Sequence, residues 1–226
     1  MILLLFKKKN KSKTGNSDIA FGFKFAMDYI ETVLEYEKTL EDKINMIDFF
    51  MEVTRRDIQY DLLSKFLYSE MDDIKIDFPF AMDYFISNSD FPNKAVLIRK
   101  DKTVDLSQDT IILLPWDRYA FSYTVKSILQ NGFKYIKSNH RGYYFSDIDL
   151  CYVYNGNHSI ATGIIKKTGQ IRVKEYDIKN LFKDLTTDGL NWYINGEKQL
   201  IKVFDFRISI LYELAKTKYN LTNNSL

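Results

Sequence analysis

The stretch YNGNHSIATGII, residues 154–165, holds one of the two histidines of the chain and a glycine between two asparagines. An apolar run ends at Tyr154 and an apolar helical run follows, so we expect a strand, a polar turn and a helix that starts at about Asn157. The first N–H groups of a helix have no internal partner, and with the positive end of the helix dipole they form a site for an anion. Gly156 would let the backbone approach a ligand closely. The same spacing also fits a plain turn in which Asn157 or Ser159 caps the helix and no ligand binds.

A second motif lies upstream, in TIILLPWDRYAFSYTVKSILQNGF. We expect a buried strand at 110–114, a stop at Pro115, and a helix that opens at Trp116 or Asp117 and closes at Gly132. This order, followed by VYNGNHSIATGI, resembles the ParB/sulfiredoxin-like superfamily, in which a strand runs into Asp-Gly-x-His-Arg and then an alanine-rich helix. The resemblance covers about residues 111–173. Asn155 stands at the Asp position and Ser159 at the Arg position.

The resemblance implies phosphate handling. Members of the superfamily bind a nucleotide with this box at a helix N-terminus, and some transfer or hydrolyse phosphate, while others act on DNA. It implies a mixed β-sheet fold and places Asp117 near the base or the sugar. If chemistry occurs, His158 would be a phosphate contact or general acid/base, and Asp117 a metal ligand or base. By the resemblance Gly156, Asn157 and His158 would sit at the phosphates, with Ser159 in the arginine position, and Asn155 belongs to the same ligand-binding box.

The second histidine lies in SNHRG, residues 138–142. A neutral hydroxyl at Ser159 is a poor replacement for an arginine that would hold phosphate through two hydrogen bonds. We therefore hypothesise that Arg141, next to His140, supplies the charge that Ser159 lacks. The other interpretation of SNHRG is an exposed turn at the end of a strand.

The two histidines also suggest a metal site. His140, Asp147, Asp149 and His158 lie within nineteen residues. We expect SDID to be part of a strand, so that Asp147 and Asp149 share one face. Such ligands suit Mg²⁺ or Mn²⁺ and phosphodiester cleavage, so a metal-dependent nuclease is one alternative, although no recognised nuclease signature surrounds these residues. A solvated strand face is the simpler interpretation of the two aspartates.

The elements that would position these residues fall into two regions. From about residue 18 to 73 the apolar residues recur with a helical period, which predicts two or three long helices, and a short helix is expected at 80–86. After residue 93 the period changes. We expect a strand at 94–99, a hairpin or loop through KDKTVDLSQ, a strand QIRVKEYDI, a hairpin with its turn at Asn195-Gly196, and a helix over 205–219.

The balance of acidic and basic residues also changes at about residue 93. Residues 1–17 carry five lysines and no acidic residue, residues 18–93 carry seven basic against seventeen acidic residues, and residues 94–226 carry twenty against thirteen. The predicted organisation is a basic tail at 1–17, an acidic helical region at 18–93 and a mixed α+β domain at 94–226. A basic second half suits an anionic ligand, although the acidic helices could instead simply neutralise it.

The amino-acid composition and the absence of some motifs exclude several classes of protein. A hydrophobic fraction of 46% and an aromatic fraction of 15% exclude a disordered chain, and the single Cys151 excludes a disulfide framework. The apolar start is too short for a membrane span and has its lysines on the wrong side for a secretory signal, so we expect no transmembrane segment and a cytoplasmic location. No Walker or Rossmann glycine motif and no hydrolase Gly-x-Ser-x-Gly is present.

The sequence thus predicts an α+β protein of ParB/sulfiredoxin-like type that binds a nucleotide or the phosphates of a nucleic acid, with phosphoryl-transfer or phosphodiester chemistry as an extension. The cofactor is not fixed by the sequence, and a nucleoside triphosphate with Mg²⁺ is compatible with it. The competing class is a non-catalytic interaction module in which the acidic helices dock a protein partner.

Overall fold

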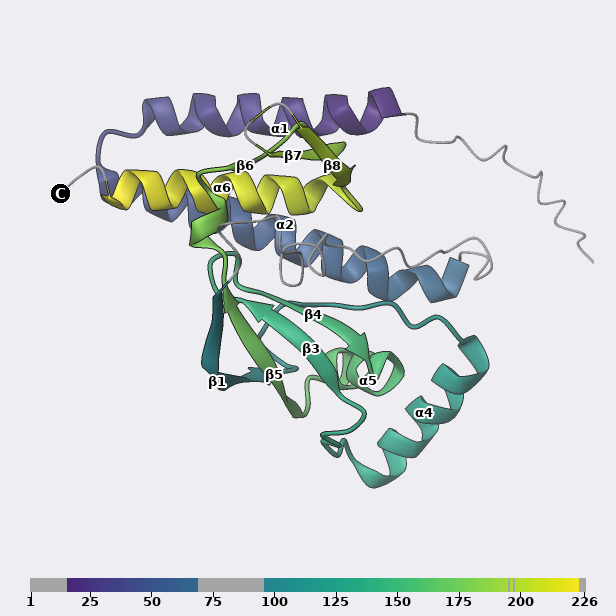
Figure 1. Ribbon diagram of the computed structural model, residues 1–226. Helices are drawn as coiled ribbons and strands as arrows, with labels where there is room; N and C mark the ends of the chain where they lie inside the picture. The colour runs from purple at the N-terminus through teal and green to yellow at the C-terminus, as the bar shows by residue number, and fades with distance from the viewer. Residues whose placement is uncertain (1–15, 69–95, 195, 197, 224–226) are drawn as a thin grey trace, which may run out of the picture.

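The computed structural model describes residues 16–68, 96–194, 196 and 198–223 as a mixed α+β structure with two sheets. A layer of three long helices lies over a five-stranded sheet, and a small three-stranded sheet lies beside the helices (Figure 1). The α+β class predicted from the sequence is confirmed. The three long helices are α1 (Asn16–Tyr36), α2 (Leu40–Tyr68) and α6 (Phe206–Asn223).

The larger sheet carries the motifs singled out above. Its strand order is β1-β5-β3-β4-β2. β2 runs parallel to β4, and β3 runs parallel to β5, while the other two neighbours are antiparallel. The bounds are β1 (Val96–Asp105), β2 (Ile111–Ile112), β3 (Arg141–Phe145), β4 (Leu150–Asn155) and β5 (Gln170–Asp177).

Both faces of this sheet are buried over β4, because its side chains alternate between two hydrophobic clusters. Leu150 and Tyr152 face the long helices, whereas Cys151 and Val153 face α5 (Asn157–Lys166). Cys151 is fully buried, and burial raises the pKa of its thiol, so it belongs to the core as a free, unreactive cysteine.

The two helices of the candidate site follow the two parallel strands. α4 (Arg118–Asn131) comes after β2, and α5 comes directly after β4. The predicted caps of α4 are confirmed, because the Asp117 carboxylate accepts from the N–H groups of Tyr119 and Ala120 at 2.9 Å each, and Gly132 is the C-cap. α4 packs on α5.

The long helices are tied to the sheet by polar contacts as well as by the core. Arg55 of α2 is buried and donates to the carbonyl of Ile148 at 3.1 Å, in the turn between β3 and β4. Arg207 of α6 contacts Asp57 and Asp61 of α2 at 2.8 and 2.6 Å. One cluster of buried apolar side chains joins α1, α2 and α6 to β4 and β5. The predicted boundary near residue 93 lies outside the described residues, as does the helix expected at 80–86.

The smaller sheet contains the hairpin predicted at Asn195-Gly196. β6 (Leu185–Thr187), β7 (Asn191–Ile194) and β8 (Lys198–Lys202) pair antiparallel in that order, and Gly196 has a φ of 73° in the turn between β7 and β8. The final helix is also confirmed as α6, which extends to Asn223.

Two local predictions are wrong. The segment expected to form a hairpin or loop after residue 99 continues β1 to Asp105, with a bulge between Ile98 and Asp101, because β5 pairs with it along that length. The SDID segment is a turn between β3 and β4 rather than part of a strand, and Asp149 has a φ of 49° there. Asp147 and Asp149 therefore do not share a strand face.

No helix within residues 16–68 or 96–223, as far as these are described, is long and apolar enough to cross a membrane.

Candidate functional site

The turn between β4 and α5 has the backbone that the sequence predicts. β4 ends at Asn155, Gly156 is the N-cap with φ 85° and ψ 18°, and α5 begins at Asn157. A glycine is required there because a side chain at this φ would be strained and its Cβ would lie 2.6 Å from the His140 ring. The expected capping by Asn157 or Ser159 is wrong, since no side-chain hydrogen bond caps α5 within the described residues.

Ser159 instead connects the turn to the other histidine. His140 is 2% exposed, and its Nδ1 accepts from the N–H of Ile136 at 3.0 Å. Its Nε2 therefore carries the proton and donates to Ser159 Oγ at 2.8 Å, and that hydroxyl donates to the carbonyl oxygen of Gly156 at 3.0 Å. Burial lowers the pKa of His140, which agrees with a neutral ring. The side chains of Ser159 and His140 are thus used to hold the turn itself.

His158 and Asp117, the residues that sequence reasoning favoured for catalysis, do lie together. His158 Nε2 accepts from the backbone N–H of Asp117 at 3.2 Å, and its ring lies beside those of Trp116 and Phe121. Burial lowers the pKa of His158, and the nearby Asp117 carboxylate opposes that shift only in part. Because Asp117 caps α4, the observed contacts of both residues join α4 to α5.

The proposed metal ligands are distributed over opposite ends of β3. His140 precedes the first residue of this strand, whereas Asp147 and Asp149 follow its last residue. Asp147 accepts from the N–H of Ile178 at 2.7 Å, and Asp149 contacts the hydroxyl of Tyr144 and the guanidinium of Arg55. No group of three or more His, Cys, Asp or Glu side chains suited to a metal ion occurs in the described part of the chain.

Arg141 is the remaining residue of the predicted site. It lines a pocket that the sequence did not predict. The pocket has a volume of about 660 Å³ and lies where β3 and β5 begin and β4 ends. Arg141 is exposed at its edge, and Asn155 is its partner on β4. The residues that line it are Asp101, Tyr135, Lys137, Ser138, His140, Arg141, Gly142, Tyr154, Arg172, Val173 and Lys174.

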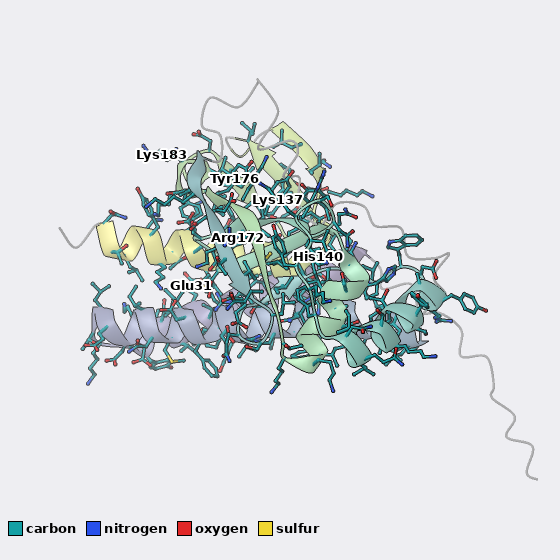
Figure 2. The ribbon with its side chains drawn as sticks, turned by 90° about the horizontal axis from the view of Figure 1, so that it is seen from below. Glu31, Lys137, His140, Arg172, Tyr176 and Lys183 are labelled. Atoms are coloured by element: carbon teal, nitrogen blue, oxygen red, sulfur yellow. The ribbon has the colours of Figure 1, made fainter. Side chains whose placement is uncertain are left out.

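This basic pocket concentrates positive charge. Among its described lining residues it has four cations, Lys137, Arg141, Arg172 and Lys174, against the single carboxylate of Asp101. None of the four cations forms an ion pair within the described ranges. Arg172, Lys137 and His140 gather at the sheet in Figure 2, and Lys183 lies well apart from them. A concave surface lined by one sign of charge attracts an oppositely charged ligand.

The strand register explains how the arginines meet. Tyr143 of β3 pairs with Lys174 of β5, so Arg141 and Arg172, each two residues earlier, lie near the starts of two adjacent parallel strands and line the same pocket. The QIRVKE alternation identifies Arg172 and Lys174 as outward residues, and β5 does bury Ile171 and Val173 instead. What the sequence lacks is a sign that β5 pairs with β3 rather than with β4.

The site is therefore a cationic pocket at one end of a mixed sheet, beside the strand–glycine–helix turn between β4 and α5. The chain belongs to a family described as a family of unknown function (DUF6710), whose model matches residues 7–225. No curated protein and no solved structure matches the chain.

Proposed function

We propose that this chain binds a phosphate-bearing ligand of nucleotide size, and that the basic pocket is the binding site. The observation that carries the proposal is the group of four cations without ion-pair partners in the described part of the chain, around a pocket of about 660 Å³. Small-molecule pockets typically enclose about 300–1,000 Å³, so the volume suits a nucleotide.

The two arginines are the strongest part of the argument. A guanidinium presents a planar fork of donors that matches two phosphate oxygens, and Arg141 and Arg172 lie near the starts of two adjacent parallel strands and line the same pocket. Lys137 and Lys174 add point charges around them. Arg141 thereby takes the role that the sequence led us to expect, which is to bring positive charge to the vicinity of the 155–159 turn.

The aromatic lining suits a base. Tyr154 is 36% exposed and lines the pocket, and its ring lies 5.1 Å from that of Tyr143. An aromatic face contributes about 1–3 kcal/mol to binding when a base stacks on it. Tyr144, the next residue of β3, is buried and contacts Asp149 instead.

The proposal includes a ParB/sulfiredoxin-like relationship. It is supported by the order of β4, glycine turn and α5, and by the motif residues around this turn. It moves the phosphate contacts, however, from the turn residues to the adjoining pocket. A Mg²⁺ ion carried by the nucleotide fits this lining, because Mg²⁺ is commonly held by one or two carboxylates plus substrate phosphates, and Asp101 offers one carboxylate.

The proposal is for binding, with no chemical step assigned. Nucleophilic or acid–base work by His158 would first require its Nε2 to leave the Asp117 N–H. The nuclease alternative gains no support from the distribution of His140, Asp147 and Asp149 over opposite ends of β3.

The test is a thermal-shift screen of the intact chain with the four nucleoside triphosphates, with and without Mg²⁺. A ligand that binds the native state raises the melting temperature by mass action. Arg141→Ala combined with Arg172→Ala should weaken binding by about 100-fold or more, since a hydrogen bond to a charged group contributes about 1.5–3 kcal/mol and each 1.4 kcal/mol is tenfold.

The matched control removes two cations elsewhere. Lys166 and Lys183 are exposed and do not line the pocket, so Lys166→Ala combined with Lys183→Ala should keep the wild-type shift. No shift with any nucleotide, or an equal loss in both double variants, would contradict a nucleotide site in this pocket.

A further inference from the structure

α1 is apolar on two opposite faces, and only one of them is buried within the described structure. Phe23 and Ile30 are 9% and 5% exposed, and with the partly buried Leu34 they pack in the core beneath α1. On the other side Phe21 and Phe25 are 69% and 65% exposed. A helix that is hydrophobic on both sides is expected to bury both, so its outer face is a candidate interface.

The exposed side chains form a continuous stripe. Phe21, Phe25 and Tyr29 follow one another at four-residue spacing, which places them on one helical face. The rings of Phe21 and Phe25 are stacked at 6.0 Å, and the ring of Tyr29 meets that of Phe50 on α2 at 5.9 Å. Tyr29 is 57% exposed. We refer to Phe21, Phe25 and Tyr29 as the α1 stripe.

The position of α1 makes this stripe accessible to another molecule. In Figure 1, α1 is the outermost helix of the helical layer, with α6 between it and the larger sheet. α1 packs on α6 and contacts α2. The stripe points away from the core side, because Phe25 lies on the helical face opposite Ile30.

From this arrangement we propose that the α1 stripe is a dimer interface, in which α1 packs antiparallel on α1 of a second copy of the chain. Antiparallel pairing about Phe25 sets Phe21 of each copy against Tyr29 of the other. A two-fold interface needs a surface that complements itself, and this spacing provides one. The inference does not depend on the ligand of the basic pocket.

Charge complementarity supports a second copy as the occupant. Lys24 and Asp28 are exposed and lie on the same flank of the stripe, one turn apart. In the antiparallel pair Lys24 of one copy comes beside Asp28 of the other, and the same pair forms again across the two-fold axis. The sequence suggested the acidic helices as the docking surface for a protein partner. Lys24 on one of them is the cation that pairs with Asp28 of a second copy.

The area is that of a reversible dimer. The three aromatic residues of the stripe, with Phe49 beside Phe50, are each more than half exposed. At about 150–250 Å² for each aromatic side chain they offer on the order of 500 Å² per copy. A standard interface buries about 800 Å² per partner, so we expect association in the micromolar range rather than an obligate dimer.

Sedimentation velocity of the full chain between about 1 and 200 µM tests this inference, because the range spans micromolar dissociation constants. The expected result is a shift from monomer to dimer. Phe25→Glu should weaken the dimer at least about tenfold by placing two charges at the centre of the interface. Tyr123→Glu changes an aromatic residue of α4 that is 76% exposed, and it should leave the dimer intact.

A charge exchange tests the antiparallel geometry. Lys24→Asp alone should weaken the dimer by about fivefold, because it sets two pairs of acidic residues together. Lys24→Asp combined with Asp28→Lys should restore it, since the pairs form again with reversed signs. Circular dichroism of each variant checks that the helices persist. The inference would be overturned by a wild-type chain that stays monomeric or by a dimer that Phe25→Glu does not weaken. It would also be overturned if monomers bound phosphatidylcholine vesicles by the α1 stripe and floated with them.

Discussion

The turn at 155–159 and the basic pocket lie side by side and share His140, yet they differ in what their polar groups do. In the turn, Ser159, His140 and the Gly156 carbonyl bond to one another. In the pocket, Arg141, Arg172 and two lysines have no ion-pair partner in the described residues. A group whose bonds are satisfied internally stabilises the fold, whereas a group of uncompensated like charges costs stability and is typical of a binding surface.

The comparison separates the motif at 155–159 from the proposed binding site, which lies on the neighbouring strands. The strand–glycine–helix turn fixes where β4 ends and how α5 starts, and that placement sets the wall of the pocket. The positive charge comes from β3, from β5 and from Lys137 in the loop before β3. Substitutions in the turn should therefore act on stability and leave the ligand largely alone, whereas substitutions in the pocket should do the reverse.

The largest effect is expected from Gly156→Ala. The left-handed φ of 85° and a Cβ 2.6 Å from the His140 ring together should cost about 2–4 kcal/mol of unfolding free energy. Gly196→Ala is the matched control, because Gly196 has a φ of 73° with nothing within 4 Å, and it should cost only about 1 kcal/mol. Urea denaturation measures both, and equal costs would mean that the packing of His140 on the turn is unimportant.

Ser159→Ala should have the next largest effect. It leaves the buried N–H of His140 without its acceptor, which costs about 1–3 kcal/mol. We expect a lower urea midpoint with ligand affinity, measured under conditions where the variant is folded, within about threefold of wild type, because the change alters no charge. A stable variant that has lost its ligand would place Ser159 in the site instead.

The pH dependence separates the neutral histidines from the charged pocket. Burial lowers the pKa of His140 and of His158, so protons bind the unfolded chain first as the pH falls below about 6.5. The two histidines therefore contribute stability that is present above that pH and lost as the pH falls toward their folded pKa values. His140→Gln should reduce the loss of melting temperature between pH 7.5 and 5.5. An unchanged slope would show that His140 is not buried as a neutral ring.

The smallest effect concerns the Asp101 carboxylate of the pocket. In EDTA-containing buffer Asp101→Asn should strengthen nucleotide binding by about two- to fivefold, because it removes the only negative charge among the described lining residues, at an exposed position. Stability should change little. Weaker binding without Mg²⁺ would show that Asp101 contacts the ligand as an acceptor, and isothermal titration calorimetry distinguishes the two outcomes.

Residue type and spacing predicted those helix ends and turns that depend only on neighbouring residues. The caps at Asp117 and Gly132, the turn at Gly196 and the start of α5 at Asn157 were all readable from residue type and spacing, because each depends on its own backbone conformation. The second half of β1 was not, since a polar stretch after residue 99 becomes a strand only through its pairing with β5, about seventy residues later.

The same limit applies to the site. Arg141 lines the pocket, and the hypothesis that it supplies the charge that Ser159 lacks stays a prediction. Arg172 and Lys174 were missed because nothing local indicates that β5 runs parallel to β3, which is the pairing that sets their cations beside Arg141. The contacts of Ser159 were missed for a similar reason, since its partner His140 comes from a loop nineteen residues earlier.

The most direct test of the central claim compares Arg172→Ala with His158→Ala by isothermal titration calorimetry, using the nucleotide that stabilises the wild type most. If the pocket holds the phosphates, Arg172→Ala should weaken binding by about 10- to 100-fold and His158→Ala by less than about threefold. A ligand that tolerates Arg172→Ala but is lost with His158→Ala would contradict the account and return the phosphates to the turn.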